Sequence, residues 1–298
     1  MLRRSNHKNF RAFSCLFVVK KQEETIMNDY AEENTLDVTN PAPRCPVVLL
    51  LDVSGSMSGA PVQELREGLI QFLRETSDDE TASMSVELEV ITFGGDVNVV
   101  SPFAPVSIIN DNPPELVADG GTPLGEALIL ADRELKERRR LYKNKGISSY
   151  KPWVILMTDG CPNDDWKRPA NSMKTLGEQK KIQYFGIGIG EEADFETLRE
   201  ILPQHPGPVK LKGLCFKEFF SWLTDSLKSV SASSVAEQDN IRLGNVNSWA
   251  DLTGTPATEN CPCHAGMAMR SPCPVTDTSG GKSRARTPAA CGSHPVRA

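Results

Sequence analysis

Residues 45–57 read Cys-Pro-Val-Val-Leu-Leu-Leu-Asp-Val-Ser-Gly-Ser-Met, and this stretch decides the fold. The apolar run from Val47 to Val53 predicts a strand that is buried on both faces of a parallel sheet. Because residues two apart in an extended chain point to the same side, Asp52, Ser54 and Ser56 are expected to converge at the carboxyl end of this strand. Hard divalent cations prefer such oxygen ligands, with few carboxylates and some retained water. The stretch therefore predicts a buried strand that ends in a candidate metal site.

Two later stretches add oxygen ligands to this candidate site. The sequence Gly-Gly-Thr-Pro at 120–123 precedes a predicted helix, and its glycines give a mobile backbone that presents the Thr122 hydroxyl. The sequence Met-Thr-Asp-Gly at 157–160 ends a second buried strand with Asp159. Open α/β sheets bind ligands at the carboxyl ends of their strands, where the strand order changes direction. If the two buried strands are neighbours, Asp52 and Asp159 face each other across that crevice.

Strands and helices alternate along the central part of the chain. This alternation predicts an α/β fold, with a doubly wound, mostly parallel six-stranded sheet that has helices on both faces. The third strand follows a short Gly-Gly-Asp turn, which suits an antiparallel hairpin. The predicted strands are 47–53, 86–93, 97–100, 153–157, 182–189 and 209–211, and the predicted helices are 61–73, 123–140, 170–180, 195–202 and 216–230.

The two ends differ in composition from the central domain, which is predicted to span residues 45–232. Residues 1–44 are expected to be a disordered extension and acidic leader, with Met27 as an alternative start of translation. Residues 233–298 are expected to be a disordered tail, since large apolar residues are almost absent from most of it. Zinc binding is the alternative for the cysteines and histidines of this tail, whose spacing is unlike the usual pairs: Cys261, Cys263, His264, Cys273, Cys291 and His294.

Asp-x-Ser-x-Ser, Gly-Gly-Thr-Pro and Thr-Asp-Gly occur in this order along the chain. Together they resemble the metal-ion-dependent adhesion site of von Willebrand factor A domains and integrin inserted domains. The resemblance implies that Ser54, Ser56 and Thr122 contact the ion directly. It also implies that Asp52 and Asp159 act directly or through water and orient the serines. The ion would keep one position open for a carboxylate of a protein partner, so a non-enzymatic binding module is expected.

The resemblance covers about residues 44–232, and Mg²⁺ is the expected ion, with Mn²⁺ and Ca²⁺ as alternatives. Within and beyond that range, the stretches Arg44–Asp52, Pro152–Gly160 and Trp249–Leu252 look like the bacterial TerY-type group, which is associated with tellurium resistance. This narrower resemblance implies a cytoplasmic scaffold in a stress-response complex, encoded beside a protein kinase and a phosphatase.

Composition and charge exclude several classes of protein. The net charge of −6 argues against a nucleic-acid binder, and no apolar run reaches the roughly 18 residues that a membrane span needs. The eight cysteines lack the spacing of a secreted disulfide scaffold, which favours a reducing cytoplasm. The basic stretch Lys136–Lys145 is expected to be a solvated helix end, with a phosphate-rich partner as the alternative.

A metal-dependent hydrolase is the alternative function. A nucleophilic Asp52 of the haloacid-dehalogenase kind would need a second carboxylate two residues later, where Ser54 stands. No Gly-x-Ser-x-Gly elbow surrounds the serines, and the only histidine within the predicted domain is His205, in a proline-rich loop. The sequence therefore favours a binding module over an enzyme.

Overall fold

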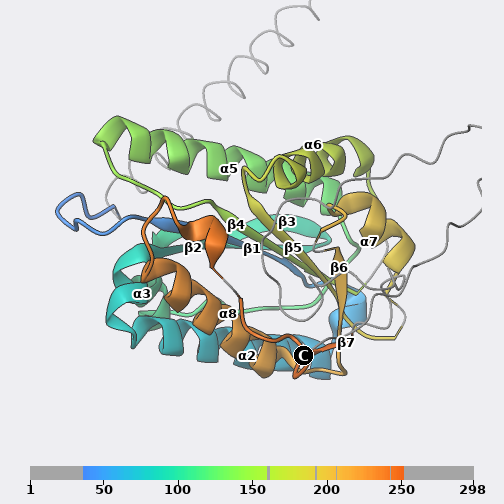
Figure 1. Ribbon diagram of the computed structural model, residues 1–298. Coiled ribbons are helices and arrows are strands. Elements are labelled where there is room, and N and C mark those ends of the chain that lie inside the picture. Colours follow the sequence, from blue (N-terminus) through green and yellow to red (C-terminus); the bar gives the residue numbers. More distant parts are fainter. Residues whose placement is uncertain (1–35, 160–161, 192, 206, 242, 252–298) are drawn as a thin grey trace, which may run out of the picture.

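The computed structural model describes residues 36–159, 162–191, 193–205, 207–241 and 243–251. These residues form a sheet that is covered on both faces by helices (Figure 1). The strands lie side by side in the order β3-β2-β1-β4-β5-β6-β7. Their bounds are β1 (Cys45–Asp52), β2 (Val86–Gly94), β3 (Asp96–Pro105), β4 (Trp153–Thr158), β5 (Gln183–Gly188), β6 (Pro208–Leu211) and β7 (Ala250–Asp251).

The predicted fold class is confirmed. Strand β1 is parallel to β2 on one side and to β4 on the other, and the parallel pairing continues through β5 to β6. Strands β2 and β3 form the expected antiparallel hairpin. All six predicted strands are present, and the two-residue strand β7 adds a seventh, antiparallel to β6. The strand order changes direction between β1 and β4, which places the ligand-binding edge of such a sheet at the ends of these two strands.

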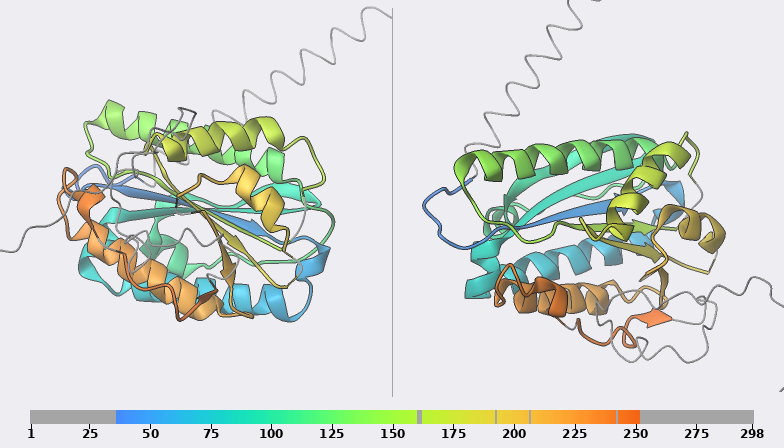
Figure 2. Two further views of the ribbon diagram at one scale, coloured as in Figure 1. Left: turned by 45° about the vertical axis from the view of Figure 1, so that its right-hand side comes forward. Right: turned by 45° about the horizontal axis from the view of Figure 1, so that its top comes forward.

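The helices form two layers, one on each face of the sheet (Figure 2). Alternate residues of β1 belong to the core beneath each layer. Val47, Leu49 and Leu51 pack beneath the helices of one face, whereas Val48 and Leu50 pack beneath those of the other. The first layer contains α2 (Ala60–Ser77), α3 (Glu80–Ser85), α4 (Val106–Asp111) and α8 (Phe216–Ser231). The second contains α5 (Leu124–Lys145), α6 (Lys167–Glu178) and α7 (Phe195–Ile201), while η1 (Gly55–Met57) and η2 (Gln238–Asn240) are short 3₁₀ turns.

Five of these helices match predicted ones, and two short helices were not predicted. Helices α3 and α4 have six residues each, which is too short for an apolar repeat to appear in the sequence. Helix α3 begins after Asp79, whose carboxylate accepts a 2.9 Å hydrogen bond from the amide of Ala82. Such capping fixes the start of a helix without any periodic pattern.

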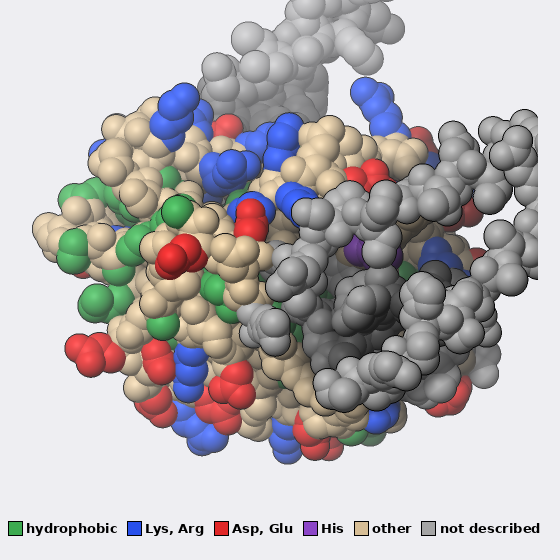
Figure 3. Space-filling model, in the orientation of Figure 1, with side chains coloured by type: hydrophobic (Ala, Val, Ile, Leu, Met, Phe, Trp, Pro, Cys, Tyr) green, Lys and Arg blue, Asp and Glu red, His purple; other side chains and the backbone are tan. Residues whose placement is uncertain are grey.

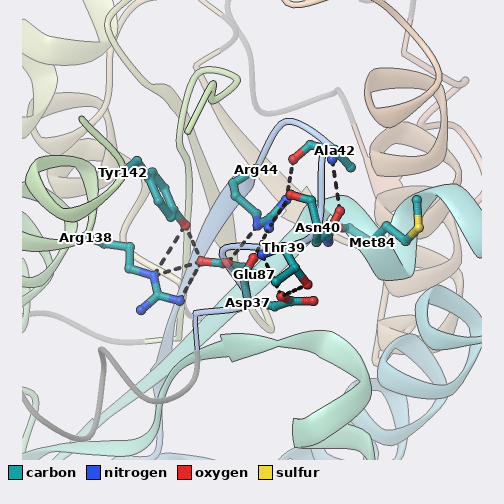
Figure 4. Close-up of polar contacts among 9 residues, drawn as sticks. All are labelled: Asp37, Thr39, Asn40, Ala42, Arg44, Met84, Glu87, Arg138 and Tyr142. Atoms are coloured by element: carbon teal, nitrogen blue, oxygen red, sulfur yellow. Dashed lines mark hydrogen bonds and ion pairs between the residues drawn. The ribbon is translucent and has the colours of Figure 1, made fainter. Parts of the chain in front are cut away.

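Residues 36–44 are ordered against the domain, in contrast to the disordered leader predicted for 1–44. Figure 4 shows the buried guanidinium of Arg44, which donates to the carbonyl oxygens of Asp37 (2.7 Å) and Asn40 (3.2 Å). The same guanidinium lies 3.2 Å from the carboxylate of Glu87 on β2, which also pairs with Arg138 of α5 at 2.7 Å. The buried Arg44–Glu87 ion pair therefore attaches this segment to the sheet. Met27 and the rest of 1–35 lie outside the described residues.

The folded part also continues beyond the predicted boundary at residue 232. The side chain of Trp249 is 1% exposed, and its ring centroid lies 5.0 Å from that of Phe219 and 5.1 Å from that of Trp222, both on α8. The indole of Trp222 donates a 2.9 Å hydrogen bond to the carbonyl of Gly244. Residues 243–251 are thus part of the domain. The rest of the tail predicted for 233–298, residues 252–298 with the candidate zinc ligands, lies outside the described residues.

Candidate metal centre

Asp52 is the last residue of β1, and its carboxylate is held at both oxygens. The side chain is 0% exposed. Oδ1 accepts a hydrogen bond from the amide of Ser54 (2.9 Å), and Oδ2 accepts one from the hydroxyl of Thr158 (2.5 Å). Burial raises the pKa of Asp52, the hydrogen bonds from Ser54 and Thr158 oppose this shift, and the nearby charge of Asp159 adds to it. A nearby cation would therefore favour the ionised form of this carboxylate.

The two serines connect the end of β1 to the end of β4. The Ser54 and Ser56 hydroxyl oxygens lie 3.1 Å apart, and the Ser56 hydroxyl donates a 3.0 Å hydrogen bond to Oδ1 of Asp159. Ser54 is buried, whereas Ser56 is exposed and Asp159 is half-buried. The three side chains therefore form a polar series that runs from the interior to the surface at the predicted ligand-binding edge.

Asp52 ends β1 and Asp159 directly follows β4, and these two strands are neighbours, which is the condition that the sequence analysis set for the two aspartates to meet. Strand β1 pairs with β4 in parallel, with Leu51 opposite Met157. Asp52 and Thr158 are therefore the next residues on the two paired strands, and Asp159 comes directly after Thr158. The structure thus brings four of the five predicted ligands, Asp52, Ser54, Ser56 and Asp159, into one hydrogen-bonded group.

Thr122 lies on the loop beside this group and is 7% exposed. Its hydroxyl forms no hydrogen bond with another described residue. The preceding Gly120 places it, because the Gly120 carbonyl accepts a 2.9 Å hydrogen bond from the amide of Gly55, between the two serines. The loop is thereby next to the serines, although no hydrogen bond among the described residues joins the Thr122 side chain to them.

The two glycines before Thr122 are constrained, whereas the sequence suggested a mobile backbone. Gly120 has φ +69°, and a Cβ atom there would lie 2.4 Å from Cα of Gly95. The carbonyl of Gly121 accepts a 2.9 Å hydrogen bond from the Gly95 amide. These glycines therefore serve a left-handed turn and a close approach of two backbones.

Thr158 is a residue of the candidate site that sequence reasoning missed. It lies inside the Thr-Asp-Gly stretch, but only the aspartate was assigned a role. Its buried hydroxyl donates to Asp52, on the neighbouring strand. The signal in the sequence was that both buried strands end in a polar residue, Asp52 and Thr158. This signal predicts their hydrogen bond only once the two strands are known to be neighbours.

The side chains present fit a hard divalent ion. All donors are oxygens, and the buried Asp52 carboxylate has a raised pKa that an adjacent cation would offset. Among the described residues, no three His, Cys, Asp or Glu side chains form a group that could hold a metal ion. The candidate site accordingly depends on the hydroxyls of Ser54, Ser56 and Thr122, and an ion there would be held by few carboxylates.

The remaining surface features have simpler explanations. Lys and Arg side chains gather over α5 at the top of the molecule in Figure 3, but several of them have acidic partners on the same helix. Lys136 pairs with Asp132 at 2.5 Å, and Arg140 pairs with Glu137 at 2.5 Å. No helix in the described ranges is long and apolar enough to cross a membrane.

Curated proteins similar to this chain include inter-alpha-trypsin inhibitor heavy chains. Heavy chain H4 of Sus scrofa is 24% identical over 218 residues, which cover 66% of this chain and 23% of that protein. Heavy chain H4 of Homo sapiens is 28% identical over 172 residues, which cover 54% of this chain and 17% of that protein. The chain thus spans less than a quarter of the length of these two relatives.

Solved structures with a similar fold include two metal-loaded proteins. Proximal thread matrix protein 1 from the mussel byssus, with a zinc-occupied MIDAS motif, has a TM-score of 0.47 at 17% identity and covers 62% of this chain and 48% of that chain. Manganese-loaded TRAP protein of Plasmodium vivax has a TM-score of 0.42 at 19% identity, and the match covers 61% of this chain and 73% of that chain. Both TM-scores are below 0.5, and we base no inference on either structure.

A family model gives the clearest comparison. The model of the von Willebrand factor type A domain matches residues 47–214, which is more than half of the 298-residue chain. The matched range runs from the first residues of β1 to the turn before α8, and it includes all five candidate ligands. The chain belongs to the von Willebrand factor type A domain family.

Proposed function

We propose that this chain is a divalent-ion-dependent protein-binding module whose ion is bound by Ser54, Ser56 and Thr122, with Asp52 and Asp159 in supporting positions. The observation that carries the proposal is the hydrogen-bonded series from Ser54 through Ser56 to Asp159, which joins the ends of β1 and β4. It brings two hydroxyls and a carboxylate together at the edge where open α/β sheets bind ligands. Membership of the von Willebrand factor type A family supports the same function.

The proposed ion is Mg²⁺, with Mn²⁺ and Ca²⁺ as alternatives. Hydroxyl and carboxylate oxygens are the ligands that these ions prefer. Ser54, Ser56 and Thr122 are uncharged, so direct contacts through these hydroxyls alone leave a bound ion electrophilic toward a further oxygen ligand. The proposed partner is therefore a protein that offers an acidic side chain.

A binding role is preferred to hydrolysis because of the surroundings of Asp52. A nucleophilic or acid–base role requires a base or acid within hydrogen-bond reach. The described hydrogen bonds of Asp52 come from the Ser54 amide and the Thr158 hydroxyl, and both hold the carboxylate rather than exchange protons with it. His205 is exposed in the turn between α7 and β6, and it is not among the described hydrogen-bond partners of Asp52.

We further propose a setting for this module: a bacterial, cytoplasmic scaffold of the TerY type, linked to tellurium resistance and to a neighbouring kinase and phosphatase. The stretches Arg44–Asp52, Pro152–Gly160 and Trp249–Leu252 support this narrower proposal. Copurification of the kinase or phosphatase with the chain in Mg²⁺, and its loss in EDTA, is the expected result. Copurification that EDTA leaves unchanged would contradict an ion-dependent scaffold.

Ion binding is tested first, by calorimetric titration of the metal-free chain with Mg²⁺ and Mn²⁺. The wild-type chain should bind one ion, and Asp52→Ala should bind none. Asp111→Ala, which removes an exposed carboxylate at the end of α4, is the matched control and should bind as the wild type does. A wild-type chain that binds neither ion would refute the proposed metal centre.

Partner binding is tested with the same variants. A partner captured in Mg²⁺ should be released by EDTA and should not be retained by Asp52→Ala. Replacing the partner's acidic contact residue by its amide should abolish capture as completely as EDTA does. Capture that survives all three changes would show that binding does not pass through the ion.

A further inference from the structure

The loop after β4 supplies the N-terminal cap of α5. Helix α5 begins at Leu124, and the side chain of the preceding Pro123 makes no capping hydrogen bond. The carboxylate of Asp164 takes that role from a distant part of the chain. Its Oδ1 accepts from the amide of Gly125 (3.0 Å) and its Oδ2 accepts from the amide of Glu126 (2.9 Å). These bonds satisfy two first-turn N–H groups and place a negative charge at the positive end of the helix dipole.

The same loop also holds the backbone of Thr122. The amide of Asn163 donates a 3.1 Å hydrogen bond to the Thr122 carbonyl. The two loops pack without spare space, because a Cβ atom on Gly125 would lie 2.8 Å from Oδ2 of Asp164. The segment that carries Thr122 is therefore attached directly to the segment that follows Asp159.

The other side of the Thr122 loop is attached through backbone groups. The carbonyls of Gly120 and Gly121 accept 2.9 Å hydrogen bonds from the amides of Gly55 and Gly95. Other loops reach residues 120–126 through several hydrogen bonds in the described part of the chain. The bonds from Asp164 are made by a side chain, whereas the others are made by backbone groups. Asp164 is thus the contact that a point substitution can remove while the backbone contacts remain.

From these contacts we infer that Asp164 is a positioning residue that fixes Thr122 relative to Asp159, so that ligands from two separate loops meet at one ion. The inference rests on the proposed function. In this proposal Asp164 does not contact the ion, and the effect of Asp164 on the ion passes through α5 and Thr122. Loss of such a supporting contact in a metal site typically lowers metal affinity by about 10- to 100-fold.

The test is a double-mutant cycle on Mn²⁺ affinity, measured by calorimetry on the full chain. Asp164→Ala should weaken Mn²⁺ binding about tenfold when Thr122 is present. On a Thr122→Ala background it should leave the affinity nearly unchanged, because the ligand it positions is gone. Asp164→Asn keeps one acceptor oxygen and should restore part of the affinity.

A matched variant separates positioning from stability. Asp79→Ala removes the cap of α3. Helix α3 directly precedes β2, so it lies at the amino ends of the parallel strands, whereas Asp52 lies at their carboxyl ends. Both cap variants should lower the melting temperature in EDTA, but only Asp164→Ala should change Mn²⁺ affinity. If Asp164→Ala shows no cooperative melting in EDTA, the cycle is run with Asp164→Asn.

Two results overturn the inference while leaving the proposed function intact. One is unchanged Mn²⁺ affinity in Asp164→Ala when the wild type binds the ion. The other is an equal loss of affinity with and without the Thr122 hydroxyl. A wild-type chain that binds no Mn²⁺ overturns the proposed metal centre, and the inference with it, so the two failures are distinguishable.

Discussion

The hydroxyl of Thr158 donates a 2.5 Å hydrogen bond to Oδ2 of Asp52, between the central strands β4 and β1. The other oxygen of the carboxylate accepts from the amide of Ser54 at 2.9 Å. Both oxygens of a fully buried carboxylate are therefore held in place by neighbouring strand and loop residues. This arrangement fixes the orientation of Asp52 and makes Thr158 the first residue to test.

Thr158→Val should weaken Mg²⁺ binding by about tenfold, because it removes a supporting hydrogen bond from a carboxylate of the proposed metal centre. The valine keeps the shape of the side chain but leaves the buried Oδ2 of Asp52 without this donor. That loss should also lower the free energy of unfolding in EDTA by about 1–3 kcal/mol. Calorimetric titration and urea unfolding measure the two effects.

Thr158→Ser is the control for this prediction. It retains the hydroxyl that reaches Asp52 and should bind Mg²⁺ within about twofold of the wild type, well inside the range of a lost supporting contact. Equal affinities for the valine and serine variants would show that the hydrogen bond does not contribute to ion binding.

Asp52→Asn should abolish the stabilisation of the fold by Mg²⁺, which for the wild type at 100 times the dissociation constant is about 2.7 kcal/mol. In EDTA at pH 7 the variant should be at least as stable as the wild type. Burial raises the pKa of Asp52, so its contribution favours folding below the unfolded pKa and is lost as the pH rises through the folded pKa. At pH 7, above the unfolded pKa, the raised pKa of Asp52 therefore makes its carboxyl group a cost to folding, and the uncharged amide removes that cost.

Melting curves with Mg²⁺, Mn²⁺ and EDTA check this prediction. The wild type should melt at a higher temperature with either ion than with EDTA, whereas the three Asp52→Asn curves should coincide. Identical wild-type curves in all three conditions would contradict an ion site. A large drop in the melting temperature of Asp52→Asn in EDTA would show that the charge of Asp52 stabilises the metal-free fold.

Thr122→Ala should weaken ion-dependent partner binding by about tenfold or more, since it removes a proposed direct ligand, and even the loss of a supporting contact costs about tenfold in metal affinity. The melting temperature in EDTA should change little, because the Thr122 hydroxyl has no hydrogen bond with another described residue to lose. Affinity for the captured partner and the melting temperature are measured on the same preparation. Thr122→Ser, which keeps a hydroxyl, should remain close to the wild type. Unchanged partner affinity with Mg²⁺ still bound would make the ion structural.

Trp249→Ala should lower the free energy of unfolding by about 3–5 kcal/mol, the range for removing a buried aromatic side chain. The indole packs against Phe219 and Trp222 of α8, and neither of these rings belongs to a proposed ion ligand. Ion affinity should therefore stay at the wild-type value. Urea unfolding and calorimetry provide the two measurements.

The same contact defines the folded unit. A fragment of residues 36–251 should unfold in one cooperative transition, whereas a fragment of residues 45–232 should be less stable because it lacks both Arg44 and Trp249. Equal stability of the two fragments would show that the flanking segments contribute nothing to the domain.

The sequence by itself determined the central strand and the composition of the candidate site. The apolar run at 47–51 has no polar face, so burial on both sides was its only favourable state, and the structure divides it between two core clusters. Asp52, Ser54 and Ser56 converge as expected, but not by strand alternation alone, because the chain turns as a 3₁₀ helix at Gly55–Met57 and brings the Ser56 hydroxyl within 3.1 Å of that of Ser54. Asp159 joins them because two buried strands end at the same edge of the sheet.

Only the tertiary structure decided the supporting contacts. Asp164 caps a helix that begins 40 residues earlier in the chain, Thr158 holds an aspartate on another strand, and Trp249 fills a space beside α8. A polar or aromatic side chain in a loop has many possible partners, and no periodic pattern selects one of them. The partner is chosen only when packing of the sheet and helices brings two distant segments together, because only then does burial require each polar group to find a hydrogen bond.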